Sequence, residues 1–257
     1  MKLLTTILVT FIAGMGAGLG TGFAGMSAAT VISPVLIAFL GMEPYTAVAI
    51  ALSSDVLASA VSAYTYGKHG NLDIRNGIVM MISVLIFTVV GSFVANLLPS
   101  SALGGFSYCM TIFLGMKFFF FPVMTTKESM MQVSEKVRFW ESVVCGVAIG
   151  FVCGFIGAGG GMMMLMILTM VLGYELKTAV GTSVFIMTFT ALTGAVSHIV
   201  LGELPDPTVW ILCIIFTFLW ARVASLFANK AKPKTLNRIT GVILMLIGAA
   251  VIAVTYF

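Results

Sequence analysis

Apolar residues come in long runs along this chain, and polar residues gather in short clusters between them. Most runs are about 20 residues long, the length that an α-helix needs to cross a lipid bilayer. The pattern predicts ten helical segments, near residues 3–22, 27–41, 44–67, 76–98, 102–121, 138–156, 161–173, 176–201, 208–228 and 236–256. We therefore predict an all-α polytopic membrane protein.

The second predicted segment in each half of the chain is shorter than its neighbours. At 1.5 Å per residue, the run from Gly161 to Leu172 reaches about 18 Å, whereas the hydrocarbon core of a bilayer is about 30 Å thick. The first two segments of each half are therefore expected to form either a re-entrant hairpin or two tilted, broken helices. Three spanning helices would follow each pair.

Composition agrees with the membrane class. The chain is 60% hydrophobic and 9% charged, with a mean hydropathy of +1.14, whereas soluble domains are about 45–50% apolar and about 25% charged. The net charge of +4 bears on topology and gives no reason to expect a nucleic-acid partner. The cysteines form no CxxC pair and lie inside apolar runs, so we expect small-hydrophobe packing for Cys109, Cys145, Cys153 and Cys213.

The chain resembles itself when it is shifted by 132 positions. The pattern LG-E--TAV occurs at 40–48 and again at 172–180. We infer two homologous halves, residues 1–123 and 137–257, joined by a polar linker at 124–136; such repeats are typical of transporters. Because the first helix has a mate in mid-chain, we expect it to be structural and not a cleaved signal peptide.

Basic residues gather on one side of the predicted membrane. With the N-terminus outside, the cytoplasmic side receives Lys68, Arg75, Lys127, Lys136, Arg138, Lys177, Arg222, Lys230, Lys232, Lys234 and Arg238. The loops around Glu43, Pro99 and 202–207 carry no Lys or Arg, and only Lys2 departs from this bias. Each half then crosses an odd number of times, so the two repeats are predicted to be inverted.

Inversion would bring two glycine-rich junctions together, Gly20–Ala29 and Gly154–Met163. At each junction one helix ends and another begins, and a helix N-terminus offers free N–H groups and a partial positive charge to an anion. We expect a substrate anion to be bound by Gly25, Met26, Ser27, Ala28, Ala158, Gly159, Gly160 and Gly161. The alternative is a tight turn with no role in binding.

Other glycines recur every four residues before each junction. This spacing lines one face of a helix and lets another backbone approach closely. We expect packing, not substrate binding, at Gly14, Gly18, Gly22, Gly146, Gly150 and Gly154.

Asp55 is an acidic residue deep inside a predicted span. Ionisable groups at that depth are costly and are usually functional, so we expect proton or ion coupling, with a structural hydrogen bond as the alternative. Its repeat mate is Met187, so the device would be asymmetric. Hydroxyls near the same depth are further candidates for substrate binding, or else bond back to their own helix: Ser53, Ser54, Thr182 and Ser183.

Catalytic motifs do not stand out in the sequence. It shows no Ser/His/Asp set, no paired carboxylates and no HExxH helix, and the glycines at 157–161 lack dinucleotide-binding spacing. We therefore expect neither an enzyme nor a bound metal or cofactor.

The stretch Gly154–Gly161, followed by Leu172–Asp206, resembles the sulfite exporter TauE/SafE family of membrane permeases. Residues 46–73 repeat this motif in weaker form, and the resemblance covers nearly the whole chain. The first half departs from it, with GFAGMSAA at 22–29 where the family often has a glycine cluster. The resemblance implies secondary transport of sulfite, sulfonates such as sulfoacetate, or some carboxylates, commonly with proton coupling.

The sequence as a whole favours a permease for a small anionic solute in the bacterial cytoplasmic membrane. The resemblance implies that the anion is sulfite, a sulfonate or a related sulfur oxyanion, and we expect it to be moved by alternating access with protons or another coupling ion. A passive anion channel of the same fold, a carboxylate transporter and a membrane-embedded assembly subunit are the alternatives. The oligomeric state stays open, a homodimer included.

Overall fold

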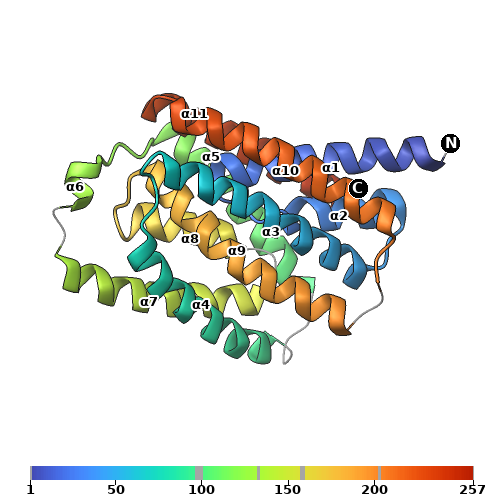
Figure 1. Cartoon of the computed structure of the whole chain (residues 1–257), viewed down its shortest axis with the longest axis horizontal. Coiled ribbons are helices and arrows are strands. Elements are labelled where there is room, and N and C mark those ends of the chain that lie inside the picture. Colours follow the sequence, from blue (N-terminus) through green and yellow to red (C-terminus); the bar gives the residue numbers. More distant parts are fainter. Residues whose placement is uncertain (1, 96–100, 132–133, 157–159, 202–203, 257) are drawn as a thin grey trace.

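The computed structural model describes residues 2–95, 101–131, 134–156, 160–201 and 204–256. These ranges contain helices and no strand (Figure 1). The helices are α1 (Lys2–Ala24), α2 (Ala29–Leu40), α3 (Pro44–Lys68), α4 (Ile74–Ala95), α5 (Ser101–Phe120), α6 (Lys127–Met131), α7 (Glu135–Ile156), α8 (Gly160–Met170), α9 (Leu176–Leu201), α10 (Pro207–Lys230) and α11 (Pro233–Tyr256). The predicted all-α class is confirmed, and α6 adds a short turn of helix in the linker.

Five helices in the described ranges are long and apolar enough to cross a membrane. They are Leu3–Ala24, Pro44–Lys68, Leu176–Val200, Pro207–Lys230 and Pro233–Thr255. Shorter apolar helices accompany them, and both α2 and α8 are among these, as the sequence predicts. Leu3, Leu4 and Val200 are among many large apolar side chains on the surface, which suits a surface that faces lipid.

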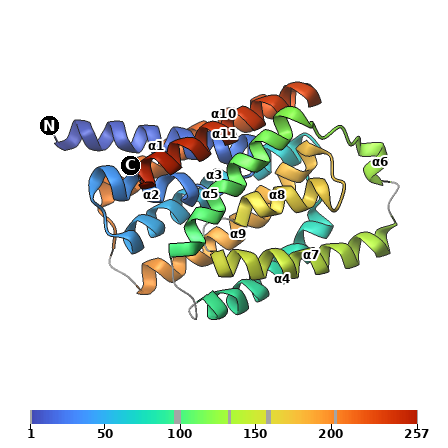
Figure 2. The ribbon, with the colours of Figure 1, turned by 180° about the vertical axis from the view of Figure 1, so that it is seen from behind.

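Helices from the two halves pack against each other in a regular pattern. Helix α1 lies along α10, α4 lies along α7, α3 lies along α9, and α5 lies along α11 (Figures 1 and 2). The 132-residue repeat relates α1 to α7 and α4 to α10, so it exchanges the first two pairs and maps each of the others onto itself. A two-fold relation between the halves would produce this pairing, whereas their inverted orientation in a membrane stays a prediction.

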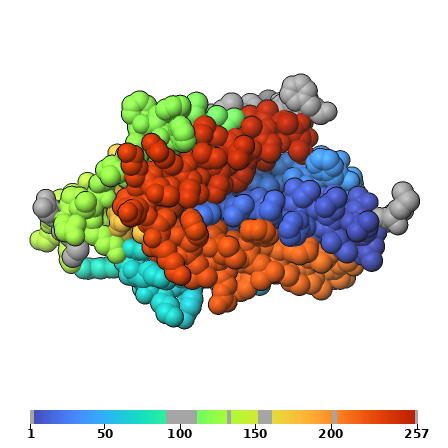
Figure 3. All heavy atoms as spheres, turned by 90° about the horizontal axis from the view of Figure 1, so that it is seen from above, coloured from blue at the N-terminus to red at the C-terminus, as the bar shows by residue number. Residues whose placement is uncertain are grey.

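The α1–α10 contact is close because glycines line it. A Cβ atom at Gly18 would lie 2.6 Å from the carbonyl oxygen of Thr217, and one at Gly22 would lie 2.5 Å from the Cβ of Ala224. In Figure 3 the surface of α1, in blue, borders the orange and red surface of the C-terminal helices. The packing role expected for these glycines is confirmed here.

The mate of this contact, between α7 and α4, has the same character. Cβ atoms at Gly146 and Gly150 would lie 2.9 Å and 2.6 Å from the carbonyl oxygens of Met80 and Val84. The packing interpretation is thereby confirmed for these two glycines as well, while the surroundings of Gly154 lie outside the described part of the chain. Backbone-to-backbone packing of this kind brings the two halves close enough for their glycine-rich junctions to touch.

Candidate functional site

The first junction is a tight reversal between α1 and α2. Gly25 has φ +61°, a left-handed conformation that glycine adopts without strain. Its N–H donates to the carbonyl oxygen of Thr21 at 2.9 Å, and the N–H of Met26 donates to that of Gly20 at 3.2 Å. The Thr21 hydroxyl donates to the carbonyl oxygen of Met26 at 2.8 Å. The N–H groups of Gly25 and Met26 are therefore engaged within the turn, and the donors nearer to α2 are Ser27 and Ala28.

Asp55 reaches this turn from the middle of α3. Its carboxyl accepts a hydrogen bond from the Ser27 hydroxyl at 2.6 Å and another from the Ser59 hydroxyl, one turn along α3, at 2.9 Å. The backbone N–H of Ala28 also donates to it. The side chain is 1% exposed. The acidic group and the beginning of α2 thus form one buried cluster, a contact between distant residues that the sequence alone did not predict.

The second junction lies directly against the first. A Cβ atom at Gly161, in the first turn of α8, would lie 2.6 Å from the carbonyl oxygen of Gly25 and 2.9 Å from the backbone nitrogen of Ser27. The Ser183 hydroxyl, on α9, donates to the same Gly25 carbonyl at 3.2 Å. The two glycine-rich junctions therefore meet in the structure, while their role in binding stays a prediction.

The remaining predicted site residues lie on α3, α8 and α9 or outside the described part of the chain. Ser53 and Ser54 bond back to the carbonyl oxygens of Ala49 and Ile50, at 2.7 Å and 2.8 Å, as the alternative interpretation has it. The Thr182 hydroxyl accepts a bond from the backbone N–H of Asp73, just before α4, at 3.2 Å. Gly160 begins α8, and Ala158 and Gly159 lie outside the described residues.

Asp73, at the beginning of α4, anchors a second polar group at the end of the bundle where the basic residues gather. Its carboxylate accepts from the Tyr174 hydroxyl at 2.8 Å, and from the backbone and side-chain N–H groups of Asn76 at 3.1 Å and 2.8 Å. This group was not predicted from the sequence, although an Asp just before a predicted helix is a recognised N-cap signal.

Tyr174 is enclosed by this group. The Arg138 guanidinium lies 5.2 Å from the centre of its ring. Burial raises the pKa of the Tyr174 hydroxyl, and the adjacent Asp73 carboxylate raises it further. The hydroxyl therefore stays protonated and donates to Asp73 throughout the physiological pH range.

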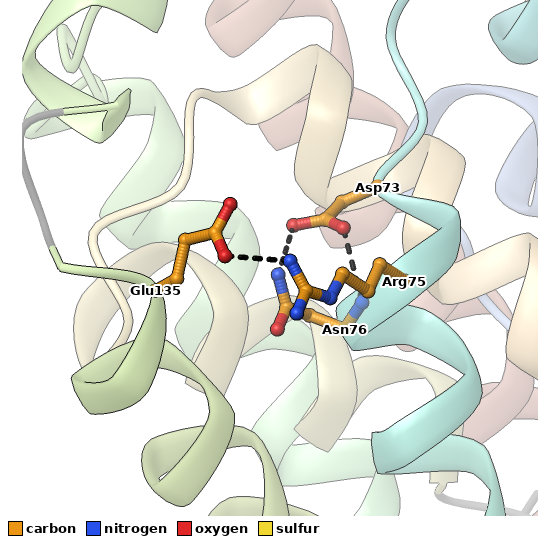
Figure 4. Close-up of polar contacts among 4 residues, drawn as sticks. All are labelled: Asp73, Arg75, Asn76 and Glu135. Carbon is orange, nitrogen blue, oxygen red and sulfur yellow. Dashed lines mark hydrogen bonds and ion pairs between the residues drawn. The ribbon is translucent and has the colours of Figure 1, made fainter.

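An exposed ion pair joins the beginning of α4 to the beginning of α7. Figure 4 shows Glu135 reaching Arg75 while Asp73 bonds to Asn76. The two charged atoms are 2.6 Å apart, but the side chains are 75% and 82% exposed. Such a pair contributes little to stability because water screens it.

Buried amides tie the same end of the bundle together. The Asn71 side chain donates to the Asn229 side chain at 2.6 Å, and the Lys177 ammonium donates to the Asn229 carbonyl oxygen at 2.8 Å. A Cβ atom at Gly181 would lie 2.8 Å from the Cβ of Tyr66. The loop after α3 is therefore held tightly against α9 and α10.

Metal-binding groups are absent from the part of the chain that the structure describes: no three His, Cys, Asp or Glu side chains gather where they could hold an ion. Cys145 and Cys213 are buried free thiols, as expected for small apolar packing.

Comparison with known proteins finds similarity over most of the chain. The family model described as "Sulfite exporter TauE/SafE" matches residues 10–251. The probable membrane transporter protein YunE of Bacillus subtilis is 24% identical over 251 residues, covering 91% of this chain and 90% of that protein. YdhB of the same bacterium, also a probable membrane transporter protein, is 25% identical over 87% of this chain and 89% of its own length. The probable membrane transporter protein MJ0441 of Methanocaldococcus jannaschii is 28% identical over 75% of this chain and 71% of its own length.

Proposed function

Because the chain belongs to the sulfite exporter TauE/SafE family, we propose that this multi-pass membrane protein is a secondary transporter of a small oxyanion. The proposed substrates are sulfite, a sulfonate or a related sulfur oxyanion. The family description supports the substrate class, and relatives named as membrane transporters support the transport role.

The observation that carries the proposal is the meeting of the two junctions at the beginning of α2. Donors gather there in a buried place: the Ser27 hydroxyl and the Ala28 N–H both point to one carboxyl group. Hydrogen-bond donors and the positive end of a helix dipole are what an oxyanion needs when water is excluded. The substrate site therefore comprises Ser27 and Ala28 of the first junction and Gly160 and Gly161 of the second, with Ser183 beside them.

The proposed topology is a pair of inverted repeats, residues 1–123 and 137–257, around the linker 124–136. The exchange of helix partners between the halves supports the two-fold relation. The concentration of Lys and Arg at one end supports a cytoplasmic location for that end and an outside N-terminus, in the bacterial inner membrane. Alternating access would then open the junctions first to one side and then to the other.

Proton coupling is assigned to Asp55, because it is the buried acid at the junctions. The test uses purified protein in proteoliposomes with an inward proton gradient and radiolabelled sulfite or sulfoacetate outside. We expect uphill accumulation that an uncoupler abolishes, and we expect Asp55→Asn to lose the response to the gradient. Empty liposomes are the control.

Two results would contradict the proposal. Flux that is only downhill in all gradients would favour the channel of the same fold. Accumulation in the Asp55→Asn protein that follows the proton gradient as in the wild type would remove the coupling role of this residue.

A further inference from the structure

The Asp55 carboxyl already sits where a substrate anion is proposed to bind. One oxygen accepts from Ser27 at 2.6 Å and the other from Ser59 at 2.9 Å, and the Ala28 N–H adds a third bond. Two of these three donors, those of Ser27 and Ala28, belong to the two residues that directly precede α2. The chain itself therefore supplies an oxyanion to the donors that the substrate needs.

We propose that Asp55 is an internal competitor of the substrate: its carboxylate occupies the donors of Ser27 and Ala28, and the anion binds when a proton neutralises Asp55 and frees them. This inference rests on the proposed function, because it assumes that an anion binds at the junctions. Proton coupling and anion binding then use a single shared site. Proton and anion are then bound together and are carried in the same direction.

The surroundings of Asp55 make it the group that titrates. The helices packed against α3 are α1, α2, α9 and α10, and Asp55 is the only Asp or Glu within any of these five helices. Their other titratable groups are Lys2 in α1, Tyr45, Tyr64, Tyr66 and Lys68 in α3, Lys177 and His198 in α9, and Cys213, Arg222 and Lys230 in α10.

Several of these other groups have partners elsewhere. Lys177 bonds to the Asn229 carbonyl oxygen, and His198 stacks on Tyr45 with ring centres 4.4 Å apart. The Tyr66 hydroxyl donates to the Gly22 carbonyl oxygen at 2.9 Å. No cation among the described residues is bonded to Asp55, so nothing but its neutral donors holds the carboxylate.

The repeat explains why there is one such competitor. The position that matches Asp55 in the second half is Met187, and the position that matches Ser27 is Gly159. The second junction therefore has neither the carboxyl nor the hydroxyl, and it can approach an anion with backbone alone. One titrating group at a pair of junctions predicts one proton taken up for each anion bound.

The experiment measures sulfoacetate binding to the purified full chain by calorimetry across pH. Sulfoacetate is the probe because its carboxyl titrates near pH 4 and its sulfonate stays ionised, so its own charge is constant from about pH 6 to 9. We expect wild-type affinity to fall about tenfold per pH unit once Asp55 is ionised. Asp55→Asn should bind with an affinity that does not change with pH.

Two further measurements guard against a folding defect. Adding sulfoacetate to weakly buffered wild-type protein with a pH dye should raise the pH, by about one proton per anion, without any variant. Glu43→Gln is the matched control. The Glu43 carboxylate also accepts a hydrogen bond from a helix N-terminus, from the Thr46 N–H at 2.8 Å, but this side chain is exposed. We expect it to keep the wild-type pH dependence.

Each outcome decides the question. If Asp55→Asn and wild type show the same pH dependence, or if binding takes up no proton, the inference fails and the transport proposal stands. If sulfoacetate binds the variant but not the wild type at high pH, competition is supported. If neither protein binds sulfoacetate at any pH, the sulfonate site itself fails.

Discussion

Gly161→Ala tests whether the close approach of the two junctions is required for anion binding. The new Cβ would lie 2.6 Å from the Gly25 carbonyl oxygen and 2.9 Å from the Ser27 nitrogen. Real Cβ contacts are essentially never shorter than 3.0 Å, and both neighbours are backbone atoms that cannot rotate away. The first turn of α8 must therefore move off the turn at Gly25.

The size of the effect follows from this overlap. Forcing one extra carbon into a packed interior costs about 1–3 kcal/mol. If the junctions separate to relieve it, the cost falls on the anion site, and each 1.4 kcal/mol is a factor of about ten in affinity. We expect sulfoacetate to bind about fivefold to about 140-fold more weakly.

The assay is calorimetric titration at acidic pH, with thermal unfolding measured on the same samples. Gly67→Ala is the control, since its Cβ would meet only Leu72, at 3.3 Å from Cδ2 and 4.0 Å from Cβ. It should bind as the wild type does. An unchanged sulfoacetate affinity in Gly161→Ala, with the protein folded, would show that the junction contact does not form the site.

Three further predictions concern stability, measured by chemical unfolding in detergent. Asn237 is buried and bonds to both the N–H and the carbonyl oxygen of Val123, at 2.7 Å and 2.9 Å; Asn237→Ala should cost about 1–3 kcal/mol for each group left unpaired, and a neutral result would mean that water replaces the side chain. Gly18→Ala should lower the free energy of unfolding because the new Cβ forces α1 away from α10, whereas no change would contradict the close packing. Arg75→Ala breaks the exposed pair with Glu135 and should change stability by less than about 1 kcal/mol; a larger loss would show a buried role.

The helix boundaries were predictable because local residue types determine them. The expected segments 44–67 and 176–201 match α3 (Pro44–Lys68) and α9 (Leu176–Leu201) closely. Proline is favoured in the first turn of a helix, and glycine adopts the left-handed conformation that ends one. Gly41 and Gly173, which precede these helices, both have positive φ, at +60° and +63°.

The partners of the polar side chains were not predictable in the same way. The Asn71–Asn229 bond joins residues 158 positions apart, and no local sequence pattern predicts such a pair. Asp55 was recognised because a buried acid is rare in a span, but its bond to Ser27 depends on how α2 and α3 cross. The inverted repeat predicted that the junctions would face each other. It did not predict that the N–H groups of Gly25 and Met26 would be hydrogen-bonded within the turn.

The contact between α1 and α10 also constrains how the protein is assembled. Gly14 lies against Phe216, some 200 residues further along the chain, and synthesis at about 5–20 residues per second separates them by roughly 10–40 s. During that time α1 has no partner for its glycine-lined face. Helices α2 and α3 also pack against α1, but this face stays uncovered in the bilayer until α10 (Pro207–Lys230) is made.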